Sequence, residues 1–328
     1  MHQTMLANYW NKFGCKWGLW LDYRGREFRA LAATARRTQA EDGRPVISMS
    51  QLGRQGRFGN WLFQYMFLKC YARKHNLQVQ TPHWPGHELF GCDDRLITAT
   101  LPAYHDDTGQ DAPATPLLQR RETIASVDFV GYFQYPTRVY APYKDFIRRL
   151  FTPQPGLAAK LEQGVRHVVP GGRTLVGLHI RRGDFGEDQF YITPTAWYLE
   201  LLEQLWPTLD NPILYIASDE PEKIVADFAD YRPRTARDLR VRLPHAPYFL
   251  DFYVLTQAHV LAIPNSTFSF FAALLNRNQQ EVYRSHLCEP LESPPFRQVD
   301  PWNSDVLDHH ACVEMFPNVA GIRRAESK

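Results

Sequence analysis

Short apolar runs alternate with helix-length amphipathic stretches along most of the chain. The first run, residues 46–49, leads into a glycine-rich loop and then into residues 61–74, whose apolar positions follow helical spacing. Asn60 is suited to cap this helix, and residues 77–81 have the composition of a strand. This opening pattern predicts a β-α-β unit.

Residues 84–118 interrupt the alternation. They are rich in Pro, Asp, His and Gly, which is typical of an irregular excursion rather than of a regular element. An apolar-aromatic stretch at 129–135 and a predicted helix at 143–151 follow, and the prolines just beyond that helix indicate a domain boundary. The predicted organisation is an N-terminal extension (1–44), a first domain (45–152), a second domain (153–290) and a C-terminal extension (291–328).

In the second predicted domain the alternation becomes regular. The predicted strands are 174–180, 213–217, 241–243 and 259–263, and the predicted helices are 193–206, a helix opening at 219, 248–258 and 268–275. Thr193 and Pro194 are a suitable cap and first-turn proline for the first of these helices. Repeated strand-helix units predict an α/β fold with a parallel sheet, and ligands are expected outside the carboxyl ends of its strands.

Polar residues follow three successive predicted strands. The first strand leads into residues 179–184, the second into 218–220 and the third into 265–267. The adjacent Arg181 and Arg182 can bind the oxygens of a pyrophosphate through paired hydrogen bonds, and hydroxyls and N–H groups at the start of the next helix can add an uncharged cradle.

Structural alternatives exist for each of these features. An Arg-Arg pair is usually a solvated surface feature, although this pair ends an apolar strand. Asp219 and Asn265 are also suited to cap helices, and Gly56 to Gly59 is compatible with a simple tight turn.

Composition narrows the classes of function. With 328 residues and 44% hydrophobic residues, the chain can bury a core in each of two domains. The formal charge of +2 gives no reason to expect a nucleic-acid partner. Five cysteines without a CxxC pair favour a reducing compartment, and no apolar run is long enough to cross a bilayer. We therefore expect a cytoplasmic protein, or a soluble piece of a larger one.

Five ordered segments resemble the α1,2-fucosyltransferase family, whose relatives include α1,6- and protein O-fucosyltransferases. Residues 179–184, His-Ile-Arg-Arg-Gly-Asp, are similar to its HxRRGD signature. The others are 56–64 (GGLGNQLFQ-like), 131–134 (GYFQ), 218–220 (SDD-like) and 265–269 (NSTFS). The resemblance covers residues 46–285, with departures at Arg57, Phe58, Trp61 and Phe270-Phe271.

This resemblance implies a GT-B fold, with two Rossmann-like domains facing each other across a cleft. It also implies an inverting transfer of L-fucose from GDP-β-L-fucose to a hydroxyl of a galactose-containing glycan, most simply the 2-OH. No other cofactor is implied, and because the sequence has no Asp-x-Asp pair, no metal is expected.

The resemblance further implies roles for individual residues. Arg181 and Arg182 stabilise the departing diphosphate, Ser266 and Thr267 add hydrogen bonds to it, and His179 holds the nucleotide or the fucose. Asp219 accepts a hydrogen bond from the edge of the guanine base. The remaining substrate-binding candidates in the matched segments are Ser218, Asn265, Gly56, Gly59 and Asn60.

Asp184 is the candidate base for the acceptor hydroxyl, with Glu187 and Asp188 as reserves. The alternative is that Asp184 only forms an ion pair that orients Arg181 or Arg182.

Two rival functions remain open: a GT-B transferase for another nucleotide-sugar or another fucosyl linkage, and a binding module without turnover. The presence of Asp184 beside both arginines argues against the second. Two minor groups of residues are assigned no function: Asp308 to Cys312 has metal-ligand residue types, and Trp10, Trp17 and Trp20 are interpreted as packing for an extension.

Overall fold

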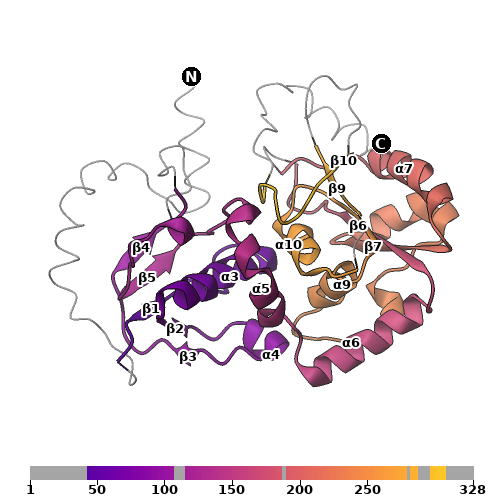
Figure 1. Cartoon of the computed structure of the whole chain (residues 1–328). Coiled ribbons are helices and arrows are strands. Elements are labelled where there is room, and N and C mark those ends of the chain that lie inside the picture. The colour runs from indigo at the N-terminus through magenta and orange to yellow at the C-terminus, as the bar shows by residue number, and fades with distance from the viewer. Residues whose placement is uncertain (1–42, 107–114, 187–189, 279–280, 287–295, 308–328) are drawn as a thin grey trace.

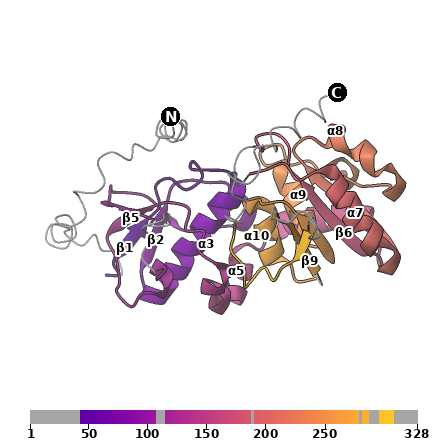
Figure 2. The same ribbon diagram turned by 90° about the horizontal axis from the view of Figure 1, so that it is seen from above.

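The computed structural model describes residues 43–106, 115–186, 190–278, 281–286 and 296–307. Two α/β halves lie side by side, each built around one sheet of five strands (Figure 1). Seen from above, helices α3 and α10 run next to each other where the halves meet (Figure 2).

The first sheet has the strand order β3-β2-β1-β5-β4, and all of its neighbouring strands are parallel. Its strands are β1 (Val46–Ser48), β2 (Gln78–Thr81), β3 (Arg95–Leu96), β4 (Ala103–His105) and β5 (Val127–Val130). The helices of this half are α3 (Phe58–His75), α4 (Gly86–Phe90) and α5 (Lys144–Leu150), with 3₁₀ turns η1 (Leu117–Gln119), η2 (Thr137–Val139) and η3 (Ala141–Tyr143).

The second sheet has the order β10-β9-β8-β6-β7, and only the pair β10-β9 is antiparallel. Its strands are β6 (Thr174–Ile180), β7 (Pro212–Ser218), β8 (Val260–Ile263), β9 (Glu281–Ser285) and β10 (Phe296–Gln298). Its helices are α6 (Pro155–Val168), α7 (Thr195–Leu205), α8 (Pro221–Ile224), α9 (Tyr248–Leu255) and α10 (Thr267–Leu275), with 3₁₀ turns η4 (Trp206–Thr208), η5 (Val225–Tyr231) and η6 (Ala236–Leu239).

The α/β class and the main alternation of strands and helices are confirmed, and several local predictions are wrong. Residues 241–243 form no strand. The stretch 84–118, which was predicted to be irregular, contains α4, β3 and β4. The two strands are too short and too exposed to give an apolar pattern. β10 lies in the stretch that we assigned to a C-terminal extension.

Both predicted helix caps are also wrong. α3 begins at Phe58, before Asn60, and Arg57 stands at its N-cap without a side-chain capping bond. α7 begins at Thr195 with Pro194 at the N-cap, and the Thr193 hydroxyl is instead hydrogen-bonded to Ser285 Oγ at 2.9 Å.

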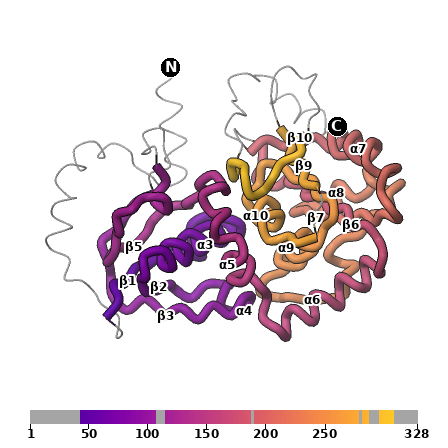
Figure 3. The backbone as a smooth tube through the Cα atoms, in the orientation of Figure 1, coloured from indigo at the N-terminus to yellow at the C-terminus, as the bar shows by residue number. Residues whose placement is uncertain are grey.

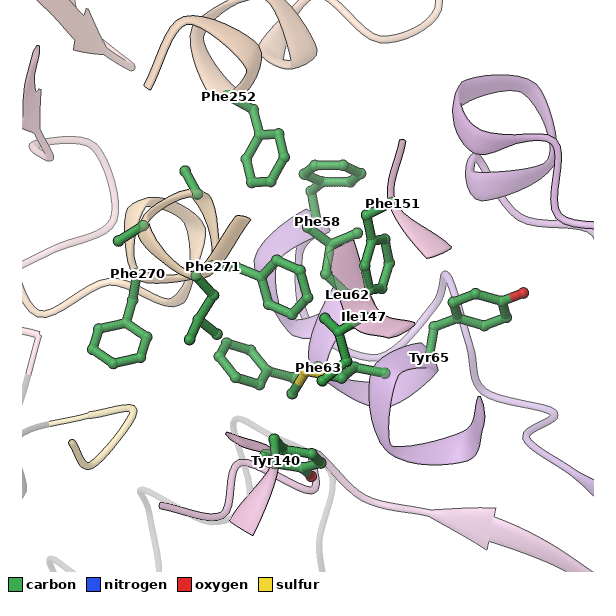
Figure 4. Close-up of a cluster of buried hydrophobic side chains, with 14 of the residues drawn as sticks. Phe58, Leu62, Phe63, Tyr65, Tyr140, Ile147, Phe151, Phe252, Phe270 and Phe271 are labelled. Atoms are coloured by element: carbon green, nitrogen blue, oxygen red, sulfur yellow. The ribbon is translucent and has the colours of Figure 1, made fainter. Parts of the chain in front are cut away.

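The two halves share one hydrophobic core, to which α3 and α10 both contribute. Phe63 of α3 and Phe271 of α10 meet edge to face, with ring centroids 4.9 Å apart (Figure 4). Phe271 makes a second edge contact of 4.9 Å with Phe151, which follows α5. Phe58, at the start of α3, packs against Phe252 of α9 at 5.1 Å. The halves are therefore joined by buried apolar surface.

After β10 the chain runs back to the first half and packs against it, and this path can be followed in Figure 3. Thr137 donates its backbone N–H to the Ser304 carbonyl at 2.8 Å, and Ser304 donates its N–H to Thr137 Oγ1 at 3.0 Å. The Lys144 ammonium lies 5.5 Å from the centroid of the buried Trp302 ring. These contacts fasten the second half to the first at a second place.

Within the described part of the chain, no helix combines the length and the apolar character that crossing a membrane requires.

Gly59 permits the closest approach between the halves. A Cβ at Gly59 would lie 2.6 Å from the Phe268 nitrogen and 2.7 Å from the Thr267 carbonyl carbon, so the α10 backbone would have to move. We expect Gly59→Ala to lower the free energy of unfolding by about 1–3 kcal/mol, although Ala favours helix, because overpacking against backbone is the larger effect.

Gly156, in the first turn of α6, is the matched control, since nothing lies within 4 Å of its added Cβ. Gly156→Ala should leave stability within about 1 kcal/mol of wild type, on the stabilising side. Urea unfolding of the three proteins measures both effects. Equal stabilities for the two variants would contradict the close contact at Gly59.

Candidate functional site

The polar segments of the second half gather at one edge of its sheet. β6 and β7 are parallel and in register to their last residues, with Ile180 opposite Ser218, and β8 lies on the other side of β6. The segments that follow all three strands therefore emerge together, as the sequence predicts. The segment after β8 leads directly into α10.

Arg181 is held by two carboxylates at this edge. Its NH1 is 2.9 Å from Asp219 Oδ2 and its NH2 is 2.5 Å from Asp184 Oδ1. The guanidinium also lies 5.5 Å from the Phe185 ring centroid, and the side chain is 15% exposed. Arg181 is thus fixed in place by its partners while its side chain stays partly exposed.

Arg182 has different surroundings from Arg181. Its guanidinium is buried and donates to the carbonyl of Thr193 at 2.9 Å and to Thr195 Oγ1 at 2.7 Å. The structure therefore does not bring the two arginines to one surface. The contacts of Arg182 support a structural role, and its role as a phosphate ligand stays a prediction.

Asp219 and Gly183 fix the loop that carries Arg181. Asp219 Oδ1 accepts the Arg182 backbone N–H at 3.0 Å, while Oδ2 pairs with Arg181. A Cβ at Gly183 would lie 2.4 Å from Asp219 Oδ2, so only glycine leaves room for this carboxylate. The contacts of Asp219 support holding the loop, whereas its predicted contact with guanine stays untested.

His179 is buried beneath the edge and ties β6 to α10. Its Nδ1 lies 2.7 Å from Ser269 Oγ, and its ring is 5.2 Å from that of Phe268. Burial lowers the pKa of His179 to about 3, so the ring is neutral at physiological pH. A neutral, buried imidazole is suited to orient α10 rather than to carry charge to a ligand.

The remaining predicted residues of this half lie beside the arginine loop. Ser218 Oγ accepts the backbone N–H of Glu220 at 3.1 Å and so shapes the turn after β7. Asn265 is fully buried, and Ser266 is the N-cap of α10 without a side-chain capping bond.

Asn60 connects the first half to α10. Its Oδ1 accepts from Gln134 Nε2 at 3.0 Å and from Thr267 Oγ1 at 2.9 Å. Gly56 has φ +77°, and a Cβ there would lie 2.2 Å from Asn60 Nδ2, which explains the glycine. Three of the predicted segments thus meet at one amide side chain.

The predicted segments of the first half are also bonded to each other. Gln64 Nε2 donates to the Gly131 carbonyl at 2.9 Å, next to the contact between Gln134 and Asn60. Asp128, which sequence reasoning missed, accepts from Ser48 Oγ and Ser50 Oγ at 2.6 Å each and from the Ser50 N–H at 2.8 Å. This carboxylate fixes the start of the glycine loop.

Arg57, one of the departures from the family pattern, reaches across the junction to the second half. Its NH2 is 3.0 Å from Asp184 Oδ2, with the two side chains 66% and 50% exposed. Asp184 therefore stands between one arginine from each half. No sequence signal indicates this pair, because the residues are 127 positions apart.

The junction is suited to hold a small anion. The N-termini of α3 and α10 meet there through Asn60 and Thr267, and neither helix has an acidic residue in its first turn. Unpaired N–H groups and the helix dipoles attract negative charge. Arg57 is the N-cap residue of α3, and Asp184 links its guanidinium group to that of Arg181.

The reserve bases stay a prediction, and the structure bears on the metal prediction only through the residues that it describes. Among the described residues, no group of three or more His, Cys, Asp and Glu side chains is placed to hold a metal ion. Several predicted residues lie outside the described ranges: Glu187, Asp188, Asp308 to Cys312, Trp10, Trp17 and Trp20.

Comparison with known proteins gives a sequence match over part of the chain. No protein-family model matches the chain. Over 131 residues the chain is 26% identical to a galactoside 2-alpha-L-fucosyltransferase of Caenorhabditis elegans, a match that covers 38% of this chain and 36% of that protein. The match thus spans about a third of the length of that curated relative. The resemblance to fucosyltransferases that the motifs predict is confirmed.

Two solved structures share the fold. One is NodZ α1,6-fucosyltransferase from Bradyrhizobium soaked with GDP-fucose, with a TM-score of 0.52 and 13% identity over 78% of this chain and 98% of that one. The other is a mutant of Arabidopsis thaliana FUT1 in complex with GDP, with a TM-score of 0.51 and 13% identity over 94% and 86%. The predicted GT-B fold is confirmed.

The neutral state of His179 predicts how stability depends on pH. Between pH 6.5 and 3 the unfolded chain binds a proton at this residue and the native protein does not, so its contribution to stability is lost as pH falls. We expect wild type to lose stability relative to His179→Gln by up to about 1.4 kcal/mol per pH unit below pH 6.5.

Urea unfolding of both proteins from pH 7 to pH 4.5 measures this difference. Burial raises the pKa of Asp251 to about 7, which gives the opposite dependence on pH, but that contribution is common to both proteins and cancels. Parallel pH profiles would contradict a neutral buried His179.

Proposed function

We propose that this protein is an inverting fucosyltransferase that transfers L-fucose from GDP-β-L-fucose to a hydroxyl of a galactose-containing acceptor, the 2-OH in the first instance. The observation that carries the proposal is Arg181, which two carboxylates hold at the edge of the second sheet and which Asp184 links to Arg57 at the N-cap of α3. The partial match to a galactoside 2-alpha-L-fucosyltransferase supports the choice of donor, acceptor and linkage.

Arg181 is the residue that binds the diphosphate of the donor. Its NH groups exchange their carboxylate partners for phosphate oxygens, while Ser266, Thr267 and the α10 N–H groups add hydrogen bonds. The charge that develops on the departing GDP is then met by donors already in position, which stabilises the transition state. The sequence predicted that Arg181 and Arg182 both bind the diphosphate, and we now assign this role to Arg181 alone.

Asp184 has two successive tasks in this proposal. Before the donor binds, it orients Arg181, and it keeps the ion pair with Arg57 afterwards. When Arg181 turns to the diphosphate, Asp184 Oδ1 loses its shortest contact, keeps the 3.2 Å bond from Arg57 NH1, and takes the acceptor proton. The acceptor oxygen forms its bond to C1 of fucose as the bond from C1 to the diphosphate oxygen breaks, and GDP leaves with that electron pair.

The proposal includes no metal ion, because guanidinium groups and helix ends supply the positive charge. It also places the protein in the cytoplasm, a prediction that still rests on the sequence. The second candidate function, a transferase for another nucleotide-sugar, differs only in the donor and is tested together with the first.

Arg181→Lys tests the phosphate site, with Arg182→Lys as the matched neighbour. A point ammonium cannot make two planar hydrogen bonds, so we expect Arg181→Lys to lose about 100- to 1,000-fold in turnover at nearly unchanged stability. Arg182→Lys leaves buried carbonyl partners unpaired and should lower the free energy of unfolding by about 1–3 kcal/mol.

Turnover and thermal unfolding of both variants give the answer. If Arg181→Lys transfers fucose at the wild-type rate, Arg181 is not the diphosphate ligand. If Arg182→Lys is as stable as wild type and loses turnover, the roles of the two arginines are the reverse of those proposed.

Incubation of the protein with GDP-fucose, GDP-mannose or UDP-galactose and a panel of galactosides tests the function itself. We expect a mass gain of one deoxyhexose only with GDP-fucose, a product with the fucose on the 2-OH, and full activity in EDTA because no step needs a metal. Asp184→Asn, run in parallel, should bind GDP-fucose and form little product.

Transfer from another donor would replace the proposed substrate, and a different linkage would correct only the acceptor. Binding of GDP-fucose without any product would indicate the silent binding module. Activity that EDTA abolishes and Mn²⁺ or Mg²⁺ restores would refute the metal-free chemistry.

A further inference from the structure

Tyr132 is an unusually exposed aromatic residue. Only two large hydrophobic side chains among the described residues are exposed, Leu96 at 56% and Tyr132 at 38%. Leu96 lies on the edge strand β3. Tyr132 instead follows an inner strand, two residues after β5 ends at Val130. Ligands of parallel sheets bind outside the carboxyl ends of the strands, and Tyr132 presents an exposed aromatic side chain just after such an end.

The turn that presents Tyr132 is fixed on both sides. Before it, the Gly131 carbonyl accepts from Gln64, and Gly131 has φ +149° where a Cβ would lie 2.1 Å from Asp106 Cβ. After it, Phe133 has φ +51° and donates its N–H to Asp106 Oδ2 at 2.6 Å.

Aromatic packing adds to this constraint. The Phe133 ring stacks on Phe67 of α3, with centroids 3.9 Å apart and planes at 4°. A non-glycine residue with positive φ is a strained conformation, which persists only where its surroundings determine it. The chain therefore uses strain and buried packing to hold one tyrosine at the surface.

The position of Tyr132 relative to the proposed reaction centre follows from Gln134. Gln134 is bonded to Asn60, which in turn contacts Thr267 at the start of α10. Tyr132 is two residues from Gln134, a backbone span of at most about 7 Å, and so belongs to the turn that carries this contact. It belongs to the first half, while Arg181 and α10 belong to the second.

We propose that Tyr132 is an acceptor-binding residue, on which the apolar C–H face of a galactose-type pyranose ring stacks while the sugar hydroxyl approaches Asp184. A rigid aromatic surface binds such a face with little loss of conformational entropy, and the phenol O–H can bond to a ring substituent. This inference rests on the proposed fucosyltransferase function and deepens it by assigning the acceptor side of the site.

Substitutions at Tyr132 test the inference, with Leu96→Ala as the matched control because it removes the other exposed large side chain. We expect Tyr132→Ala to raise the acceptor KM about 10-fold, at unchanged KM for GDP-fucose and unchanged thermal stability. Tyr132→Phe and Tyr132→Trp keep an aromatic face and should stay within about threefold of wild type. Leu96→Ala should leave every parameter unchanged.

The outcomes distinguish a failure of acceptor binding by Tyr132 from a failure of the proposed fucosyltransferase function. If wild type transfers no fucose to any galactoside, the proposed function fails. If wild type is active and Tyr132→Ala keeps the acceptor KM, or raises the KM of GDP-fucose instead, Tyr132 does not bind the acceptor. An equal effect of Leu96→Ala would also overturn the inference, because it would show a loss that is not specific to the site.

A chemical readout needs no turnover. Nitration of tyrosines in wild type, followed by peptide mass analysis, should modify Tyr132, and a galactoside at saturating concentration with GDP present should protect it. GDP alone should not protect it. Protection by GDP without galactoside would place Tyr132 on the donor side and contradict the proposal.

Discussion

The close contact between the start of α3 and the start of α10 is the constraint on which the rest of the site depends. Gly59 gives the two backbones room, and Asn60 then bonds to Thr267 across the junction. Behind this polar contact, the Phe63 and Phe271 rings belong to a core that both halves share. Because buried area stabilises in proportion to its extent, the junction is held by the same interactions that fold each half.

This arrangement positions the charged residues through elements that pack against each other. The helix ends are brought together by packing, Asp219 and Gly183 set the direction of Arg181, and Asp184 bridges from Arg181 to Arg57. A site built on rigid elements needs little rearrangement when an anion binds. The charge pairs therefore serve to keep Arg181 oriented, and their exchange for phosphate is the local change that we propose on donor binding.

The sequence predicted the parts of the fold that carry strong local signals. β6 is buried along almost its whole length and reads as a continuous apolar run, so its bounds were predicted to the residue. β3 and β4 have exposed or half-exposed side chains and give no such pattern, and β10 exists through its antiparallel pairing with β9. Pairing between strands leaves little trace in local composition.

The sequence predicted that the polar segments gather at one sheet edge, but not how their side chains contact each other. Strand ends identify the edge, but the direction of each side chain depends on the backbone that leaves the strand. Arg181 and Arg182 therefore looked equivalent in the sequence and have opposite surroundings in the structure. Arg57 and Asp128 act through partners far away in the chain, which a single sequence cannot reveal.

Hydrogen exchange with and without GDP tests the account most directly, because it reports on both halves at once. The account predicts that GDP slows exchange of the backbone amides at 181–186 and 266–269 in the second half and also at 57–60 in the first. The rest of the two sheets should stay unchanged. Protection of the second half alone would contradict a shared site at the junction, and protection elsewhere would contradict the diphosphate site itself.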